Sequence, residues 1–110
     1  MGDRATIQLV NGDEFSPIIY LHWAGSRAFD LIQQAAPIMR AGDISYAFAR
    51  LAGVCHMETG PDQGLSFGIF NAEGPEDPDV GDNGHFTLNM DDGQVWNGRE
   101  LVGTVELGRF

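Results

Sequence analysis

The sequence of 110 residues has one cysteine, no lysine and no long apolar run. With Cys55 alone, no internal disulfide can form, and nothing in the composition requires an oxidising compartment. The longest apolar runs span only a few residues, far fewer than the roughly 20 that a membrane-spanning helix needs. Residues 1–10 alternate between polar and apolar side chains, which is typical of a strand and not of a signal peptide. These features predict a cytoplasmic protein with a single domain over residues 1–110.

Basic residues are also missing from the middle of the chain. The formal net charge is −10 at pH 7, and residues 51–98 contribute −9 of it because they contain nine acidic side chains and no Lys or Arg. A field of one sign repels nucleic acid and acidic membranes, and it attracts basic surfaces over a Debye length of about 8 to 10 Å. The expected partner is therefore a basic protein surface, with no direct contact to nucleic acid or membrane. The nine acidic side chains are Glu58, Asp62, Glu73, Glu76, Asp77, Asp79, Asp82, Asp91 and Asp92.

Apolar alternation and turn dipeptides predict hairpins at both ends of the chain. Residues 5–10 and 16–23 have the pattern of strands, and Asn11-Gly12 between them suits the positive φ angles of a type I′ turn. Further strands are expected at residues 65–70, 86–90 and 101–107, with turns at Asp92-Gly93 and Asn97-Gly98 and a short segment at 94–96 between them.

Two helices are expected between the hairpins. Ser26 can cap a first helix that Pro37 stops near Ala36. Asp43 can cap a second helix, whose apolar stripe follows helical spacing at Ile44, Ala47, Phe48, Leu51, Ala52 and Cys55. The order β-β-α-α-β-β-β, with short turns that favour antiparallel pairing, predicts an α+β fold of two layers. We expect an antiparallel sheet of about five strands with both helices on one face.

Few side chains have the spacing that catalysis or metal binding requires. Cys55 and His56 are neighbours, but adjacent side chains on a helix point about 100° apart and cannot meet as a nucleophile and its base. Cys55 also lies on the apolar stripe, which predicts a buried core thiol. His22, His56 and His85 fit no zinc-binding spacing. We therefore expect no enzyme, no catalytic residue, no metal and no cofactor. The alternative is a hydrolase or a metal-dependent enzyme that uses the Asp and His residues.

Residues 71–84 form an expected acidic loop, since two Pro and three Gly interrupt the apolar pattern there. Residues 77–84 bring oxygen ligands near a turn, as calcium loops do. Their register differs from that of an EF-hand, because the sixth and twelfth positions counted from Asp77 are Asp82 and Leu88 instead of Gly and Glu. A solvated loop is the favoured interpretation, and a weak divalent cation site is the alternative.

The loop alone is a poor imitation of nucleic acid. From Glu73 to Asp82 the chain spans at most about 30 Å and carries five acids, whereas duplex DNA carries about eighteen charges over that length. Mimicry requires the fold to bring Asp91 and Asp92 beside the loop, and in a wider version Glu58 and Asp62 as well. Otherwise a smaller patch that pairs with a few Arg or Lys side chains of one partner is the better description.

Tyr20, His22 and Trp23 form an aromatic cluster at the end of the second expected strand, and Trp96 precedes a turn. Aromatic side chains on strands usually belong to the core, which is the favoured interpretation, but Trp and Tyr are also favoured at the centres of interfaces. An exposed aromatic strand surface is therefore the basis of an alternative function, a protein interaction or assembly module, homodimeric in one version.

Residues 4–13 (RATIQLVNGD) and 19–25 (IYLHWAG) resemble segments of small proteins encoded by phages and integrated elements. That group includes anti-CRISPR inhibitors, many of them small acidic single-domain proteins that block nucleic-acid-binding surfaces of Cas proteins. The resemblance covers about the first quarter of the chain and implies an inhibitor, without assigning a role to any residue. Together with the charge segregation, it leads to the hypothesis of a non-enzymatic phage-type inhibitor that covers a basic nucleic-acid-binding surface of a Cas effector. The residues expected to bind that surface are Glu73, Glu76, Asp77, Asp79, Asp82, Asp91 and Asp92.

Overall fold

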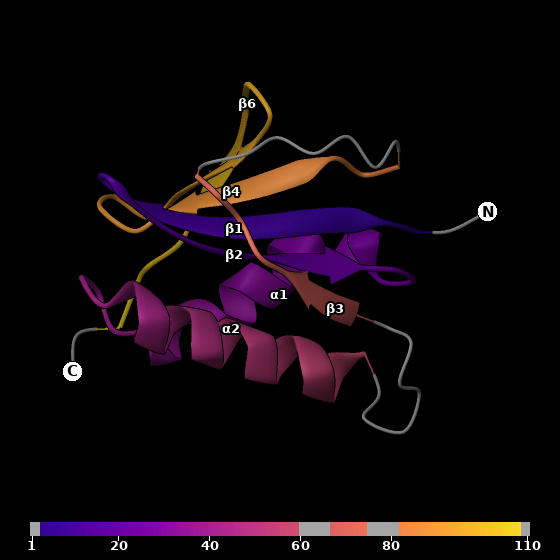
Figure 1. Cartoon of the computed structure of the whole chain (residues 1–110), viewed down its shortest axis with the longest axis horizontal. Coiled ribbons are helices and arrows are strands. Elements are labelled where there is room, and N and C mark those ends of the chain that lie inside the picture. Colours follow the sequence, from indigo (N-terminus) through magenta and orange to yellow (C-terminus); the bar gives the residue numbers. More distant parts are fainter. Residues whose placement is uncertain (1–2, 60–66, 75–81, 109–110) are drawn as a thin grey trace.

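The protein has an α+β fold in which two α-helices pack on one face of a mixed six-stranded sheet (Figure 1). The computed structural model describes residues 3–59, 67–74 and 82–108. The spatial order of the strands is β3-β2-β1-β4-β5-β6. In chain order the elements are β1 Ala5–Asn11, β2 Glu14–Leu21, the 3₁₀ turn η1 Gly25–Arg27, α1 Ala28–Ala35, the 3₁₀ turn η2 Ala36–Ile38, α2 Ile44–Glu58, β3 Phe67–Phe70, β4 His85–Asn89, β5 Gln94–Asn97 and β6 Glu100–Thr104.

The sheet differs from the sequence prediction in two respects. It has six strands, because the short segment expected between two turns pairs on both sides as β5. It is also mixed, because β4 runs parallel to β1, with Thr6 beside His85 and Val10 beside Asn89. The other neighbouring strands are antiparallel. Turn dipeptides report only the pairing of strands that follow each other in sequence, so they carry no sign of the contact between β1 and β4.

The helices and one face of the sheet enclose the core. Ala5, Ile7 and Leu9 of β1 point to the helices, and all three are fully buried. Their register partners on β2 and β4 point the same way, since paired residues share a face of the sheet. The helix residues buried in the same cluster include Leu31, Ile32, Leu51 and Cys55.

The opposite face of the sheet is polar at its centre and is nevertheless buried there. Thr6 and Gln8 of β1 are 0% and 1% exposed. The Thr6 hydroxyl lies 2.7 Å from Nδ1 of His85, and Nε2 of Gln8 donates to the carbonyl oxygen of Gly74 at 2.9 Å. Residues 71–74 therefore reach across this face after β3 ends, and β1 is buried on both of its faces.

The predicted hairpins are confirmed, but the type of their turns is not. Gly12 and Asp13 connect β1 to β2, while Asn11 still pairs with Glu14. Gly12 has a φ of +62°, and no residue other than glycine in the described part of the chain has a positive φ. The turn is therefore not of type I′, which needs a positive φ at both central residues.

The second helix begins as predicted, and the first does not. Asp43 caps α2, since its carboxylate accepts a hydrogen bond from a backbone N–H of the first turn at 3.1 Å. Ser26 caps no helix, because its backbone N–H and hydroxyl both donate to the carboxylate of Asp3. The first helix ends before Pro37, as predicted. Neither described helix is both long and apolar enough to cross a membrane.

Gly93 is expected to tolerate no side chain, whereas Gly98 should tolerate one at a lower cost. Both have a positive φ, +77° and +61°, which costs a residue with a side chain about 1 to 2 kcal/mol. At Gly93 a Cβ atom would also collide with the carbonyl oxygen of Val105, while at Gly98 it would meet nothing within 4 Å. We expect Gly93→Ala to lower the free energy of unfolding by about 3 kcal/mol and Gly98→Ala by about 1 kcal/mol, measured by urea denaturation. Equal losses in the two variants would contradict a tight contact with Val105.

Candidate functional site

The seven acidic residues predicted to bind a partner do not form one site in the described part of the chain. Three of them, Glu76, Asp77 and Asp79, lie outside the described residues. The other four separate into three places, at the two ends of the sheet and over its middle.

Asp82 is bound within the protein by Arg4. Its Oδ2 atom accepts from the Nε of Arg4 at 2.9 Å and from the backbone N–H of the same residue at 3.0 Å. The hydrogen bond from the Arg4 side chain is the main reason that the pKa of the Asp82 carboxyl is lowered. Because the guanidinium balances its charge, Asp82 adds little to the field that a partner would meet.

Asp82 belongs to a polar network that joins the start of β1 to the start of β4. The carboxylate of Asp3 accepts from the hydroxyl of Ser26 at 2.7 Å and from Nδ2 of Asn83 at 2.6 Å. The carbonyl oxygen of Arg4 accepts from the backbone N–H of Asn83 at 2.9 Å. The hydrogen bond from Ser26 is the main cause of a lowered pKa at Asp3. At this end of the sheet, acidic side chains hold the fold together.

Glu73 lies apart from both ends of the sheet. It is exposed and precedes Gly74, whose carbonyl oxygen accepts from Gln8 in the middle of β1. A single carboxylate at this place can contribute to a wider surface, but it forms no site of its own.

Asp91 and Asp92 lie where β4 ends, next to the turn that follows β1. Val10 pairs with Asn89, and the backbone N–H of Met90 donates to the carbonyl oxygen of Val10 at 2.8 Å. Parallel strands leave a sheet at the same end, so the turns after β1 and β4 emerge together (Figure 1). These two turns carry four carboxylates, which we call the acidic end: Asp13, Glu14, Asp91 and Asp92.

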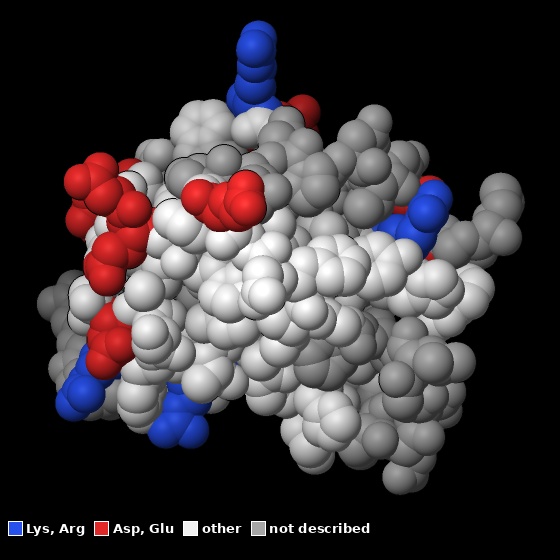
Figure 2. All heavy atoms as spheres, viewed as in Figure 1, with Lys and Arg blue, Asp and Glu red and all other residues white. Residues whose placement is uncertain are grey.

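The acidic end has no positive charge of its own. Residues 11–14 and 90–93 include no Lys or Arg, and no described residue forms an ion pair with the four carboxylates. Acidic side chains gather on the left of the molecule in Figure 2. Oδ1 of Asp92 accepts from the backbone N–H of Gln94 at 2.9 Å and so holds its turn, whereas Asp91 and Asp13 are exposed and make no such contact with a described residue.

Sequence reasoning missed Asp13 and Glu14 as members of this group. Both lie outside the acidic segment 51–98, although the turn that carries them was recognised. Only the parallel pairing of β1 with β4 brings that turn beside Asp91 and Asp92.

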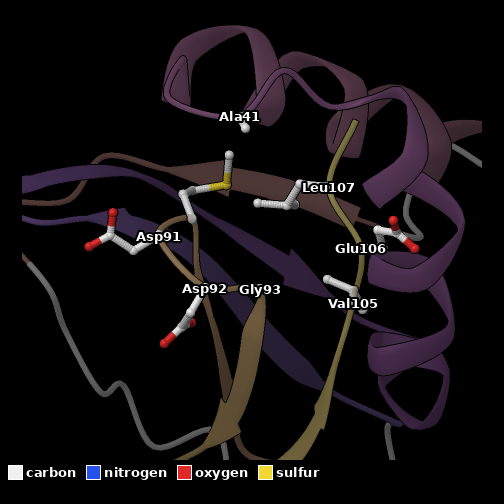
Figure 3. Close-up of a pocket in the computed structure, with 8 residues that line it drawn as sticks. Ala41, Asp91, Asp92, Gly93, Val105, Glu106 and Leu107 are labelled. Carbon is white, nitrogen blue, oxygen red and sulfur yellow. The ribbon is translucent and has the colours of Figure 1, made fainter. Parts of the chain in front are cut away.

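A cavity of about 250 Å³ opens beside Asp91 and Asp92 (Figure 3). Its other wall is the chain that follows β6, where Val105 and Leu107 point toward the cavity and Glu106 points to the other side. The backbone N–H of Val105 donates to the carbonyl oxygen of Gly93 at 2.8 Å, which fixes the two walls to each other. The acidic end thus combines a hollow of mixed polar and apolar lining with Asp91 and Asp92, whose carboxylates point away from Val105 and Leu107.

Cys55 and Glu58 both have roles within the fold. Cys55 is fully buried, and desolvation raises the pKa of its thiol to about 12, so the predicted core thiol is confirmed and is no nucleophile at neutral pH. Glu58 forms an ion pair with Arg27 at 2.8 Å, which lowers the pKa of its carboxyl. Across residues 3–59, 67–74 and 82–108, no group of three or more His, Cys, Asp or Glu side chains could hold a metal ion.

Tyr20, His22 and Trp23 form a row outside the core, in which Tyr20 and His22 are half-buried and Trp23 is exposed. The ring of Tyr20 stacks on Phe70 with 5.6 Å between centroids, and its hydroxyl lies 2.9 Å from Nδ1 of His22. Trp23 meets His22 edge-on at 4.5 Å. Trp23 and Phe70 are 57% and 50% exposed, so the favoured interpretation of this cluster as core is wrong. Because the row runs from the end of β2, beside Ala5 at the start of β1, it lies away from the acidic end.

Removing the charge of Asp82 should weaken the fold at neutral pH and not in acid. The pKa of this carboxyl is lowered from 3.8 in the folded protein, so its pairing with Arg4 stabilises the fold above that value and is lost as the pH falls. We expect Asp82→Asn to lower the melting temperature at pH 7, and the difference from the parent protein to shrink as the pH falls below 3.8. Asp91→Asn is the matched control, since its carboxylate forms no ion pair with a described residue, and it should melt like the parent. Unchanged melting of Asp82→Asn at pH 7 would contradict a stabilising role of the pair.

Comparisons of the chain with known protein families, with curated proteins and with solved structures find no match.

Proposed function

We propose that this protein is a non-enzymatic inhibitor that binds a basic surface of a cytoplasmic partner protein through its acidic end. The observation that supports this proposal is the meeting of two acidic turns at one end of the sheet, without a basic residue in either turn. At the opposite end and on the helices, Asp82 and Glu58 are bound by arginines of the same chain. The acidic end keeps its negative charge available to a partner.

The cavity beside Asp91 and Asp92 suits an arginine or lysine side chain of the partner. Such a side chain has an apolar stem, which can pack against the apolar side chains of the hollow, and a charged head, which can reach a carboxylate outside it. Val105 and Leu107 provide the apolar contact, and the carboxylates of Asp91 and Asp92 lie on the outer side of the hollow. An arginine would bind more tightly than a lysine, because its planar guanidinium can bind two carboxylate oxygens side by side.

The charges favour a small patch over an imitation of duplex DNA. Of the four predicted binding residues that the structure describes, Asp91 and Asp92 belong to the acidic end, and Asp82 is neutralised at the other end of the sheet. The five residues of β4 lie between Asp82 and that end and span roughly 13 Å in a strand. DNA carries a charge every 1.7 Å or so of its axis. We therefore propose pairing with a few Arg or Lys side chains of one partner surface.

A Cas effector is the first partner to test. The resemblance of residues 4–13 and 19–25 to phage-encoded proteins supports this choice. The nucleic-acid-binding surface of an effector is rich in Arg and Lys, so a protein that covers it would block binding of DNA or RNA without touching the nucleic acid.

A second candidate function uses the aromatic row. Trp23 and Phe70 are large, apolar and half exposed or more, which favours a protein interaction surface at the β2 and β3 side of the sheet. Binding through this surface would depend little on salt, whereas binding through the acidic end would weaken steeply as salt screens it.

Reversing one charge of the acidic end should weaken partner binding without unfolding the protein. We expect Asp91→Lys to reduce affinity for a susceptible Cas effector–guide complex about tenfold or more, because it sets like charges against each other. Asp91 is chosen over Asp92 because its carboxylate does not hold the turn. The measurement is competition with labelled target DNA across a panel of effector complexes, at two salt concentrations.

Glu100→Lys is the matched control, since Glu100 is an exposed acid beside the turn at the opposite end of β5. An equal effect of both reversals would reduce the proposal to net charge and contradict a specific site. A second measurement tests the acidic end without a Cas protein: in an NMR titration with an arginine-rich peptide, the largest shifts should fall in residues 11–14 and 90–93. Shifts confined to Tyr20, Trp23 and Phe70 would favour the aromatic row instead.

A further inference from the structure

The outer surface of the two helices carries an apolar groove that plays no part in the proposed function. It has a volume of about 310 Å³ and runs along α2 beside the end of α1. Met57 and Ile38 in its lining are 65% and 44% exposed, an unusual position for two large apolar side chains. The other α2 residues in the lining are Ala49, Arg50, Gly53, Val54 and Glu58.

Gly53 in the middle of α2 has no explanation within the chain. A glycine inside a helix costs about 0.5 to 1 kcal/mol relative to alanine. A Cβ atom added at Gly53 would meet nothing within 4 Å, so the packing of this chain does not require a glycine there. A missing side chain on an exposed helix face allows the backbone of another helix to approach closely.

We propose that the groove binds the same groove of a second copy of this chain, with the two α2 helices antiparallel and crossing at Gly53. Such an interface must be self-complementary about a two-fold axis. Met57 and Ala49 lie four residues from Gly53 on opposite sides, so the axis brings the large Met57 of one copy level with the small Ala49 of the other. Each exposed methionine then fills the groove of its partner, a role to which its flexible side chain is suited.

The charges along the groove agree with this arrangement. Arg50 lies three residues before Gly53 and Glu58 five residues after it, about 4.5 and 7.5 Å along the helix axis. In the antiparallel pair, Arg50 of one copy is therefore about 3 Å along the axis from Glu58 of the other, while the two Arg50 side chains are about 9 Å apart and the two Glu58 side chains about 15 Å apart. Glu58 also pairs with Arg27 of its own chain at 2.8 Å, so Arg50 of the other copy would be a second guanidinium beside this carboxylate, while the two Arg50 side chains and the two Glu58 side chains stay apart.

This inference is independent of the proposed function, because the groove and the acidic end lie on different elements. The two surfaces also respond to salt in opposite directions. Binding of a basic partner weakens with salt, whereas two chains of net charge −10 repel each other less when salt screens them. Dimerisation should accordingly be unchanged or strengthened at high salt.

Substitution of Gly53 should separate the stability of the helix from association of the chains. We expect the full-length protein to sediment as a concentration-dependent dimer and Gly53→Leu to weaken dimerisation at least tenfold. Gly53→Ala should raise the melting temperature of the dilute protein while weakening the dimer, because a Cβ atom suits the single helix and obstructs the second one. A merely structural glycine would not give opposite signs in these two measurements.

Gln33→Leu is the matched control, since Gln33 is an exposed residue of α1 outside the groove, and this variant should dimerise like the parent. A parent protein that stays monomeric at its highest soluble concentration overturns the proposal. So does a dimer that survives Gly53→Leu, or one that is lost in Trp23→Ala instead. Asp91→Lys should still dimerise and Gly53→Leu should still bind a basic partner, so failure of one idea leaves the other testable.

Discussion

The parallel pairing of β1 with β4 decides where the chemistry of this protein lies. It joins the first hairpin to the last three strands and makes β1 the most buried strand of the sheet. Because β1 and β4 run in the same direction, both strands start at one end of the sheet, and the turns that follow them lie together at the other end. One end of the sheet therefore carries the network of Asp3, Arg4 and Asp82, and the other end carries the two acidic turns.

The same kind of side chain consequently has two uses in this chain. Asp82 and Glu58 each lie against an arginine, and Asp3 accepts hydrogen bonds from Ser26 and Asn83, so these carboxylates are satisfied internally. At the acidic end, Asp91 and Asp92 lie beside a hollow, and none of the four carboxylates forms an ion pair with a described residue. A formal net charge of −10 does not distinguish these two groups, whereas the identity of each neighbour does.

Local patterns predicted the parts of the fold that local forces determine. Pro37 stops the first helix and Asp43 caps the second, since each acts on residues within a few positions of itself. The sequence does not show that Ser26 binds Asp3, because the two residues are 23 positions apart. It likewise does not show that Asp82 is paired within the chain, because Arg4 is 78 positions away. The acidic end was half predicted for the same reason: Asp91 and Asp92 are adjacent in sequence, but only a long-range strand pairing adds the first turn.

Burial of the single cysteine gives the protein an internal reporter of opening. The sulfur of Cys55 lies under α2 against the core, fully shielded from solvent and protonated at neutral pH. A reagent that attacks thiolates can reach it only in molecules whose second helix has left the sheet. Because the chain has no other thiol, the rate at which this sulfur is labelled measures how often α2 separates from the sheet.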